Sequence, residues 1–398
     1  MNKQNTKNYL TLACVVIFSM MLGSVITILI KGDASKDVLT AQPVVRKNSK
    51  KANFDPIYET YEAIMKEYYK EVDSDKLIDG AISGMLESLD DKHTMYFDKK
   101  AKEDFDTELT GSYYGIGAQI QLTEEKRVKI VRIFNDTPAE KSGLKVGDIF
   151  VKIDGESTEG MDATAVANKL RSSKVKEADI IIERDGEEME FKVTKENVTL
   201  YSVSSEMLDG NIGYIGVSIF GQNTYSQFKE ALEKLEKDGS KSLIIDIRGN
   251  SGGYLATVAK MLELFLDEDK VLFQMQTNEG TVTYKSSSKE KRDYPIVVLV
   301  DENSASASEI MTAAMKEEYG SAIVGKKTYG KGTVQITKDL SNGTMIKYTI
   351  EKWLTPSGKN IDGEGIEPDH EVDLSEDYMN DPSDENDSQL QKAIDLLK

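Results

Sequence analysis

The sequence predicts a multi-domain protein in which an α+β region is followed by an α/β region, and three observations predict this fold class. The chain has 398 residues, which is enough for two or three domains of ordinary size. Residues 106–195 contain short β-type runs separated by glycine-containing turns, a pattern typical of a small mixed domain. Residues 200–370 alternate apolar strands with amphipathic helices, which is typical of an α/β domain with buried strands.

A short tail, residues 1–9, is followed by an uncharged apolar run at residues 10–30. A helix over this run would span ~30 Å, enough for one bilayer crossing. No small-residue cleavage site follows the run, so we predict an uncleaved transmembrane signal anchor, with a cleaved signal peptide as the alternative. Lysines lie on both sides of the run, so charge alone does not orient the chain. Residues 31–52 are polar and form a predicted linker.

The composition argues against several classes of function. The formal net charge is -19, which disfavours nucleic acid as a partner because phosphate binding needs clustered lysine and arginine. A single cysteine rules out an internal disulfide, and with only two histidines it disfavours a structural zinc site, so we predict no metal and no cofactor. Cys14 lies inside the apolar run, which continues too far past it for lipid attachment to be favoured.

Residues 53–105 are predicted to form a helical N-terminal domain. Their apolar residues recur at helical spacing in two groups, which are Ile57, Tyr61, Ile64 and Tyr68, then Ile78, Ile82, Met85 and Leu89. We assign no chemical role to this domain.

Alternating strands and turns define the small mixed domain at residues 106–195. The predicted strands are residues 114–122, 128–134, 149–153, 180–183 and 189–193, and the predicted helix is residues 163–171. The segment Tyr114-Gly-Ile-Gly117 comes directly before residues 118–122, which suggests backbone amides beside an open sheet edge. Such an edge can pair with an extended peptide while the amides hold its C-terminal carboxylate. Taken alone, the pattern also fits an ordinary glycine-containing hairpin.

Residues 196–372 carry the alternating α/β pattern. The predicted strands are residues 212–220, 242–246 and 296–300, and the predicted helices are residues 225–237, 253–266 and 307–318. Residues 362–388 are rich in Asp and Glu and contain no Lys or Arg, which predicts an extended stretch. A short amphipathic helix follows, so residues 373–398 are interpreted as an acidic linker with a C-terminal helix.

Ser306 is the candidate nucleophile. A serine hydroxyl is a weak nucleophile until a base takes its proton. Ser306 and Glu309 also fit a helix capping box in front of an apolar helix face, so the same serine can simply begin a helix. The two roles are compatible, because a helix N-terminus stabilises nearby negative charge.

Lys331 is the candidate base. A lysine can take a proton if burial or neighbouring charges lower its pKa, so we expect Lys331 to be desolvated. His93 and His370 lie in no glycine- or serine-rich context, which leaves a Ser–Lys pair as the candidate arrangement. Gln335 follows Lys331 by four residues, and on a strand both side chains would point to one face. A lysine between glycines is also typical of an exposed turn.

Residues 246–253 form a glycine-rich turn between a predicted strand and a predicted helix. Free N–H groups at a helix start bind an anion or an oxyanion. The same residues also fit a plain strand-to-helix turn. The glycine spacing does not match a dinucleotide-binding fingerprint and no P-loop lysine is present, so an enzyme that binds phosphate here is disfavoured.

Four motifs in this order resemble those of the carboxyl-terminal processing proteases, also called tail-specific proteases. The motifs are residues 246–253, 304–309, 330–335, and 352–358 with 365–369. The separation of 25 residues between Ser306 and Lys331 also matches the family. Residues 134–148 resemble the PDZ domain that the family carries between its helical N-terminus and its protease core. The resemblance covers residues 53–372, most of the chain outside the predicted anchor.

The resemblance implies a role for each candidate residue. Ser306 would be the nucleophile, Lys331 the general base and Gln335 the residue that orients the lysine. The oxyanion hole would be the backbone N–H groups of Gly252 and Ala307. The substrate tail would bind at the PDZ loop and an apolar pocket beside it, formed by Tyr114, Gly115, Ile116, Gly117, Val166 and Leu170. The loop at residues 114–117 departs from the Gly-Leu-Gly-Phe form that is commoner in PDZ domains. Its backbone amides remain available, so the departure affects only the shape of the pocket.

The resemblance also implies a location and partners. Anchored family members work outside the cytoplasm in the cell envelope, so we expect a single-pass membrane protein with an extracytoplasmic catalytic part. Some relatives dimerise through terminal helices, here residues 53–105 and 389–398. The predicted function is a serine endopeptidase that cleaves proteins recognised by their exposed C-termini. The alternative is a PDZ-type scaffold that binds tails without cutting, although such a scaffold would not need Ser306, Lys331 and Gln335.

Overall fold

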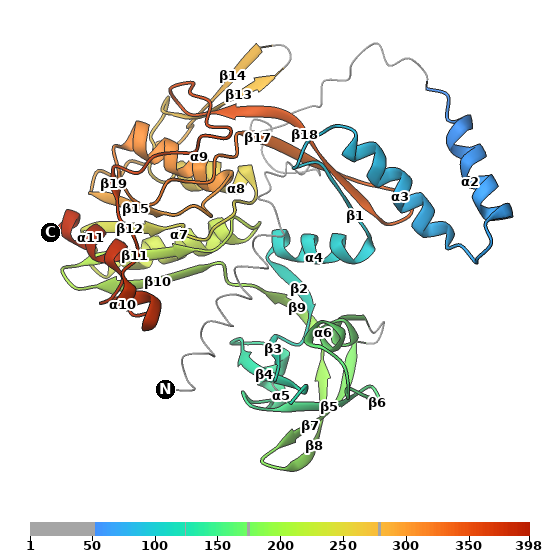
Figure 1. The fold of residues 1–398 in the computed structure, drawn as a ribbon. Helices are drawn as coiled ribbons and strands as arrows, with labels where there is room; N and C mark the ends of the chain where they lie inside the picture. The colour runs from blue at the N-terminus through green and yellow to red at the C-terminus, as the bar shows by residue number, and fades with distance from the viewer. Residues whose placement is uncertain (1–51, 124, 173–175, 278–279) are drawn as a thin grey trace. The chain divides into compact units, whose positions relative to one another are not determined.

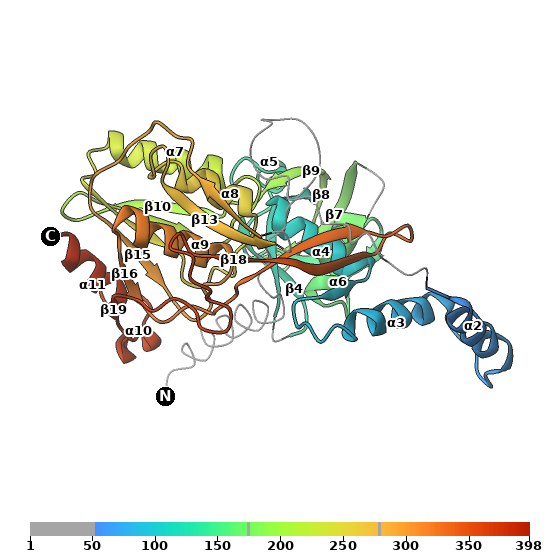
Figure 2. The ribbon, with the colours of Figure 1, turned by 90° about the horizontal axis from the view of Figure 1, so that it is seen from above.

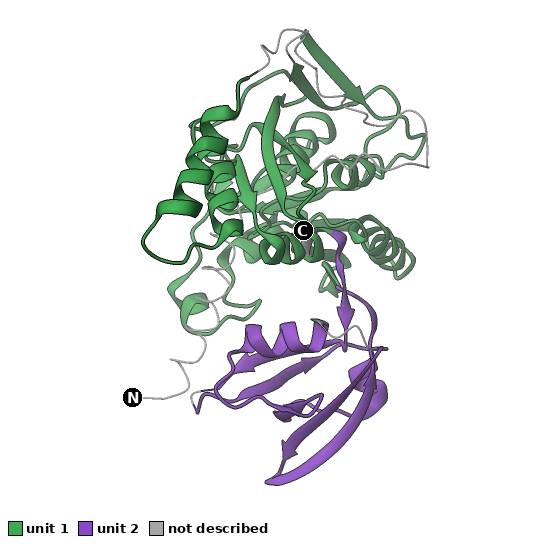
Figure 3. Ribbon diagram, turned by 90° about the vertical axis from the view of Figure 1, so that its right-hand side faces the viewer, with its two compact units in different colours: residues 1–109, 201–398 green, residues 110–200 purple. Residues whose placement is uncertain are grey.

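The computed structural model describes residues 52–123, 125–172, 176–277 and 280–398. The predicted anchor at residues 10–30 lies outside these residues, as do the preceding tail and nearly all of the predicted linker. Within the described part of the chain, no helix is both long and apolar enough to cross a membrane. The described residues form two compact units, which Figure 3 colours separately. The first comprises residues up to Leu109 together with Tyr201–Lys398, and the second is Thr110–Leu200.

The first unit is built around a mostly parallel sheet with strand order β10-β11-β12-β15-β16-β19. These strands are Val203–Leu208, Ile212–Val217, Ser242–Asp246, Ile296–Val300, Ala322–Gly325 and His370–Glu371. All residues of β12 and β15 are buried, as expected for strands covered on both faces. Alternate residues of β15 pack into two different apolar clusters, one on each face.

Helices cover both faces of this sheet (Figure 1). On one face pack α7, α8 and α9, which are Thr224–Lys237, Leu255–Leu262 and Ala307–Ala314. A π-helical turn, Met315–Tyr319, extends α9. The helix predicted over residues 307–318 is therefore present, but it changes from α-helical to π-helical geometry at Met315. On the other face packs α11, Ser388–Leu397, whose Leu390 and Ala393 join the second cluster.

A second sheet in the same unit contains β1, β18, β13, β14 and β17. These strands are Met95–Phe97, Met345–Leu354, Val271–Thr277, Gly280–Lys285 and Thr333–Asp339. β17 and β18 form a long antiparallel pair that reaches toward α3 in both views (Figure 2). β1 pairs with β18, with Met95 opposite Lys347. The sequence predicted only helices over residues 53–105 and missed β1, because this strand is made by a distant partner and not by local periodicity.

The helices of the N-terminal region are α2, α3 and α4, at Asp55–Glu67, Ser74–Glu87 and Lys99–Thr110. They confirm the predicted helical character of this region. Neither α2 nor α3 has a buried residue. Several of their large apolar residues instead remain exposed to solvent in the single chain, namely Ile57, Tyr58, Met65, Ile78 and Met85.

The second unit contains a sheet with strand order β3-β4-β5-β7-β8, to which β6 adds at β5. These strands are Ala118–Leu122, Val128–Ile133, Ile149–Ile153, Glu177–Arg184 and Glu187–Thr194, with β6 at Glu156–Ser157. A separate pair joins β2, Ser112–Gly115, to β9, Glu196–Thr199. The strand predicted over residues 114–122 is therefore two strands, because Gly117 turns the chain at φ 83°. The helices are α5, Pro138–Ser142, and α6, Ala163–Ser172.

The acidic stretch at residues 362–388 is more structured than the sequence predicted. It contains β19 and a short helix, α10, at Glu376–Asn380. Ser375 caps this helix by accepting a hydrogen bond from the N–H of Tyr378 at 3.0 Å. The prediction of an extended chain was wrong for these residues, because it rested on charge composition, which carries no information about a helix cap such as Ser375.

Candidate active site

Ser306 joins the loop after β15 to the first turn of α9, and its backbone is strained. Its φ of 60° and ψ of -114° are unusual for a residue with a side chain, and such strain costs about 1–3 kcal/mol. The surrounding contacts hold this geometry. The Ser306 N–H donates to Glu309 Oε2 at 2.8 Å, and the preceding Ala305 N–H donates to Asn250 O at 3.1 Å. A sharp, strained turn into a helix is a known way to present a serine hydroxyl.

The Ser306 hydroxyl is buried and lacks a hydrogen-bond partner among the described residues. Glu309 supplies its half of the predicted capping box by accepting from the Ser306 N–H. The predicted capping-box arrangement is present, but the Ser306 hydroxyl makes no hydrogen bond within it, so capping does not satisfy the hydroxyl. An unpaired buried polar group costs about 1–3 kcal/mol and calls for an explanation other than stability.

Lys331 lies in the loop before β17 and is 0% exposed. Its Nζ also has no hydrogen-bond partner within the described part of the chain. Burial holds the pKa of Lys331 well below its usual range, and the positive charge of Lys347 lowers it further. Glu309 and Asp91 act in the opposite direction without cancelling this effect. The expected desolvation of Lys331 is therefore present, and its amine can exist in the neutral form that accepts a proton.

One buried carboxyl group links the serine and lysine loops. Glu309 Oε2 accepts from the N–H groups of Ser306 and Lys331, each at 2.8 Å. Its Oε1 accepts from the Gly330 N–H and the Thr328 hydroxyl, each at 2.7 Å. The sequence indicated Glu309 only as part of a helix cap. Its contact with Lys331 joins residues 22 positions apart, which local spacing cannot predict.

The glycine before Lys331 lets another loop approach closely. Gly330 has a φ of 87°, and a Cβ at this position would lie 2.8 Å from Gly365 N. The carbonyl of Lys331 accepts from Trp353 Nε1 at 2.7 Å. The backbone at Lys331 is thus fixed by packing on one side and by a hydrogen bond on the other. Lys331 therefore does not lie in an exposed turn, which was the alternative interpretation of the sequence.

Gln335 is also fully buried. Its Nε2 donates to Thr333 Oγ1 at 2.8 Å and to Thr349 Oγ1 at 3.1 Å, whereas its Oε1 has no partner among the described residues. The same-face argument from the sequence does not hold, because Lys331 precedes β17 and the register shifts between Val334 and Gln335.

Gly252 lies against Ser306. Its φ is 114°, and a Cβ on this residue would lie 2.9 Å from Ala305 O, 3.0 Å from Ser306 Cβ and 3.2 Å from Ala307 N. The structure therefore brings Gly252, Ser306 and Ala307 together. The Gly252 N–H donates to Asn250 Oδ1 at 2.9 Å, so this predicted oxyanion donor is occupied in this conformation. This contact was not predicted from the sequence.

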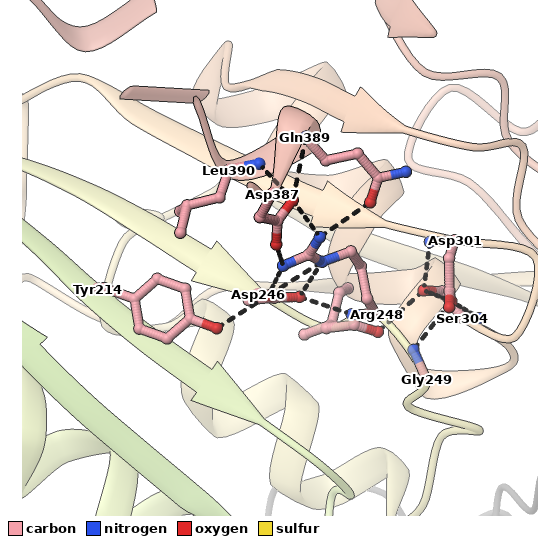
Figure 4. Close-up of polar contacts among 10 residues, drawn as sticks. Tyr214, Asp246, Arg248, Gly249, Asp301, Ser304, Asp387, Gln389 and Leu390 are labelled. Atoms are coloured by element: carbon pink, nitrogen blue, oxygen red, sulfur yellow. Dashed lines mark hydrogen bonds and ion pairs between the residues drawn. The ribbon is translucent and has the colours of Figure 1, made fainter. Parts of the chain in front are cut away.

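A buried ion-pair network fixes the turn that carries Gly252 (Figure 4). Arg248 contacts Asp246 Oδ2 at 2.5 Å and Asp387 Oδ2 at 2.9 Å. Gln389 accepts from the same guanidinium at 2.9 Å, and Tyr214 donates to Asp246 at 2.9 Å. Because Asp387 caps α11, the network ties the C-terminal helix to the turn.

On the other side of the turn, the Gly249 N–H donates to Asp301 Oδ1 at 2.9 Å. Ser304 donates its hydroxyl to the same carboxylate oxygen at 3.0 Å. The turn after β12 and the loop that leads to the candidate nucleophile therefore share one carboxylate. The two segments are held as one piece.

In the second unit, the predicted tail-binding residues occupy two different environments. β3 lies at one end of its sheet, as expected for an edge that can receive a peptide strand. Tyr114 is 41% exposed. Ile116, Val166 and Leu170 come together as predicted, but they are buried in the apolar core of the unit. In this conformation they do not line an open pocket.

Tyr113 was not indicated by the sequence and lies beside the predicted carboxylate loop. A Cβ on Gly115 would lie 2.5 Å from its ring. Burial raises the pKa of Tyr113, and the charge of Arg171, whose guanidinium lies over the tyrosine ring at 5.2 Å, opposes that rise. The Tyr113 ring therefore packs against the loop proposed for the tail carboxylate.

Neither histidine acts as a partner of Ser306 in the contacts of the described residues. His93 is buried, and burial together with the charge of Lys331 lowers its pKa to about 4. No group of three or more His, Cys, Asp or Glu side chains among the described residues is arranged to hold a metal ion.

Comparisons with known proteins match three regions of the chain. Three family profiles match it: the activating protease CtpB N-terminal domain at residues 22–101, a PDZ domain at residues 130–188, and peptidase family S41 at residues 211–372. Among solved structures, the photosystem II D1 C-terminal processing protease aligns with a TM-score of 0.46 and 26% identity, over 79% of this chain and 86% of that chain.

Two relatives from Bacillus subtilis extend over most of the chain. Carboxy-terminal processing protease CtpA is 35% identical over 370 residues, which cover 92% of this chain and 78% of CtpA. Carboxy-terminal processing protease CtpB is 39% identical over 320 residues, which cover 79% of this chain and 66% of CtpB. The chain therefore belongs to the carboxy-terminal processing proteases of peptidase family S41, serine-type peptidases with an N-terminal domain, a PDZ domain and a protease core.

Proposed function

We propose that this protein is an endopeptidase in which Ser306 is the nucleophile and Lys331 the general base, and that it cleaves proteins recognised by their C-terminal tails. The observation that carries the proposal is the pair of buried, unpaired groups. Ser306 Oγ and Lys331 Nζ both lack partners among the described residues, and one carboxylate, that of Glu309, holds both backbones. Buried groups with perturbed pKa values are typical of catalytic sites.

The chemistry requires the neutral amine of Lys331. In the first step the amine takes the proton of Ser306 Oγ, and the oxygen attacks the carbonyl carbon of the scissile peptide bond. The resulting oxyanion accepts hydrogen bonds from the Ala307 N–H and, once it is released from Asn250, from the Gly252 N–H. Lys331 then gives its proton to the leaving amine, and an ester on Ser306 remains. Water hydrolyses this ester with Lys331 again as the base, which restores the serine.

Tail recognition is assigned to the PDZ domain. The edge strand β3 supplies main-chain hydrogen-bonding groups, and the loop at residues 114–117 supplies amides for a free carboxylate. Amidation of the substrate C-terminus removes the charge without changing the sequence. The full-length protein should cleave the free-acid peptide markedly faster than the amidated one. Equal rates would refute tail recognition and leave the Ser–Lys chemistry untouched.

The proposed location is the cell membrane, with one anchor at residues 10–30 and the catalytic part outside the cytoplasm. Support comes from the length and apolarity of that run, which suffice for one crossing. Protease added to intact cells should degrade the catalytic part if this orientation holds. Protection of the catalytic part until the cells are lysed would contradict it.

A homodimer is proposed through the terminal helices. Support comes from the large apolar side chains that α2 and α3 expose, since burying apolar surface drives most protein–protein association. Ile57→Glu combined with Met85→Glu would place charges on these two helices. The molar mass from light scattering should fall from that of a dimer to that of a monomer, and a wild-type monomer would exclude the proposal.

The decisive functional test is cleavage itself. The full-length protein in detergent is incubated with envelope proteins, and new C-termini are mapped by mass spectrometry. Cleavage that disappears in Ser306→Ala supports a protease. Tail binding without any cleavage by the wild-type protein would favour the alternative, a scaffold that only binds.

A further inference from the structure

A chain of hydrogen bonds leads from the N-terminal region to Gln335. The Thr349 hydroxyl donates to Asp91 Oδ2 at 2.6 Å, and Gln335 Nε2 donates to Thr349 Oγ1 at 3.1 Å. The Thr94 hydroxyl and the His93 N–H donate to the same carboxylate at 2.7 Å and 3.0 Å. Asp91 lies between α3 and β1, whereas Gln335 and Thr349 lie opposite each other on β17 and β18.

The charge of Asp91 sets the direction of this chain. Burial raises the pKa of Asp91, but the hydrogen bonds from Thr349, Thr94 and the His93 N–H outweigh burial and lower it. The carboxylate is therefore ionised at neutral pH, and an ionised carboxylate can only accept. Thr349 gives its single hydroxyl proton to Asp91, so toward Gln335 it can only accept. The amide of Gln335 must then turn its NH2 group to Thr349.

This arrangement determines where the other end of the amide points. Thr333 Oγ1 also accepts from Nε2, at 2.8 Å, so both amide protons of Gln335 are engaged. The oxygen is left over, buried and without a partner among the described residues, as is Lys331 Nζ. An amide oxygen is an acceptor and a lysine amine is a donor, so the two unpaired groups are complementary.

We propose that Asp91, acting through Thr349, fixes the amide of Gln335 with its oxygen toward the amine of Lys331. Asp91 is thus a positioning residue that the N-terminal domain contributes to the protease core. The inference rests on the proposed function, in which Lys331 is the base and Gln335 orients it.

The pairing of β1 with β18 brings Asp91 to its place. Met95 lies opposite Lys347 on β18, and the Thr349 N–H donates to Thr94 Oγ1 at 3.3 Å. If this strand pair opened, the Thr349 hydroxyl would lose its anionic acceptor and could donate to the oxygen of Gln335 instead. The amide could then turn over, so the proposed relay makes the geometry of the base depend on docking of the N-terminal segment.

The first test uses kcat of the full-length protein on a cleaved peptide. Asp91→Asn and Thr349→Val should each lower kcat about tenfold or more, the factor that corresponds to about 1.4 kcal/mol in the barrier. Thr349→Ser keeps the hydroxyl and should retain activity. Asp79→Asn is the matched control, because Asp79 accepts from a hydroxyl, that of Tyr96, in the same domain but outside the relay. Wild-type kcat in both Asp91→Asn and Thr349→Val would overturn the proposal.

A double-mutant cycle separates positioning from a general loss of structure. If Asp91 acts only through Gln335, adding Asp91→Asn to Gln335→Ala should cause no further loss of kcat. A further loss of the same size as in the wild-type background would overturn the proposal. Full activity of Gln335→Ala would overturn it together with the role assigned to Gln335. Retained activity of Ser306→Ala would instead overturn the proposed function itself.

Discussion

Lys347 lowers the pKa of Lys331, and both lysine side chains are buried, at 1% and 0% exposed. The Lys347 amine also lies over the ring of Phe97 at 5.4 Å and over that of Phe105 at 5.8 Å. A second buried cation near a catalytic lysine disfavours protonation of that lysine. The second cation beside Lys331, the proposed base, lies on β18, the strand that β1 joins.

Lys347→Met therefore tests how the base is tuned. Methionine keeps an apolar stem against the two rings and removes the charge. Without the repulsion the pKa of Lys331 rises, so the amine becomes neutral only at higher pH. The acid limb of kcat/KM should move to higher pH, with little change on the alkaline side. Lys352→Met, which removes an exposed charge from the same strand, is the control. An unchanged acid limb in Lys347→Met would show that Lys347 does not tune the base.

Lys331→Met should abolish activity and increase stability. In the unfolded chain Lys331 binds a proton near its usual pKa of ~10.4, whereas burial lowers its pKa in the folded state. The unfolded state thus binds more protons, and this lysine destabilises the fold at neutral pH, less so as pH rises. Thermal unfolding at pH 7 should show a higher midpoint for Lys331→Met, by an amount equivalent to about 1 kcal/mol or more. A lower midpoint together with full activity would contradict this account.

Glu309→Gln should weaken both stability and activity. The carboxylate accepts from three N–H groups and one hydroxyl. A glutamine has the same shape, but its NH2 group would face N–H donors and leave them unpaired, at a cost of about 1–3 kcal/mol. The two loops would then separate, so kcat should fall more than KM changes. Calorimetry measures the stability and peptide cleavage measures the activity. A variant that matches wild type in both would show that Glu309 does not hold the two loops together.

Gly252→Ala should abolish activity through a steric clash. The new Cβ would lie 2.9 Å from Ala305 O and 3.0 Å from Ser306 Cβ. Gly249→Ala is a matched control, because Gly249 lies in the same turn at a φ of 69° but a Cβ there meets nothing within 4 Å. Gly249→Ala adds only the milder strain of a left-handed residue, whereas Gly252→Ala adds the clash together with a φ of 114° that lies outside the left-handed α region. If Gly249→Ala lost as much activity as Gly252→Ala, contact with Ser306 would not be the cause.

The sequence predicted those parts of the fold that local pattern determines. The strands at residues 149–153, 242–246 and 296–300 have the predicted bounds, because short runs rich in apolar residues between turns leave little alternative. α5 was missed, since its five residues are too short for helical periodicity. β1 was missed because a strand of three residues depends on its distant partner β18.

The candidate site was predictable in its residue types but not in its supporting contacts. Ser306 and Lys331 stand in motifs that the sequence displays, although their roles remain proposals. Asp91 carries no local signal, since its contact with Thr349 spans 258 positions in the chain. The contact of Asn250 with the Gly252 N–H was equally invisible, because a side chain that folds back on its own turn leaves no periodic pattern.

The most direct test of the central claim is the ionisation of Lys331 in the folded protein. Lysines labelled with 13C at Cε are titrated by NMR, and the Lys331 signal is assigned by its absence in Lys331→Met. We predict that Lys331 loses its proton well below the usual lysine range, because it is buried beside Lys347. A signal that titrates near ~10.4 would mean that the amine is charged at neutral pH, and Lys331 could not be the base.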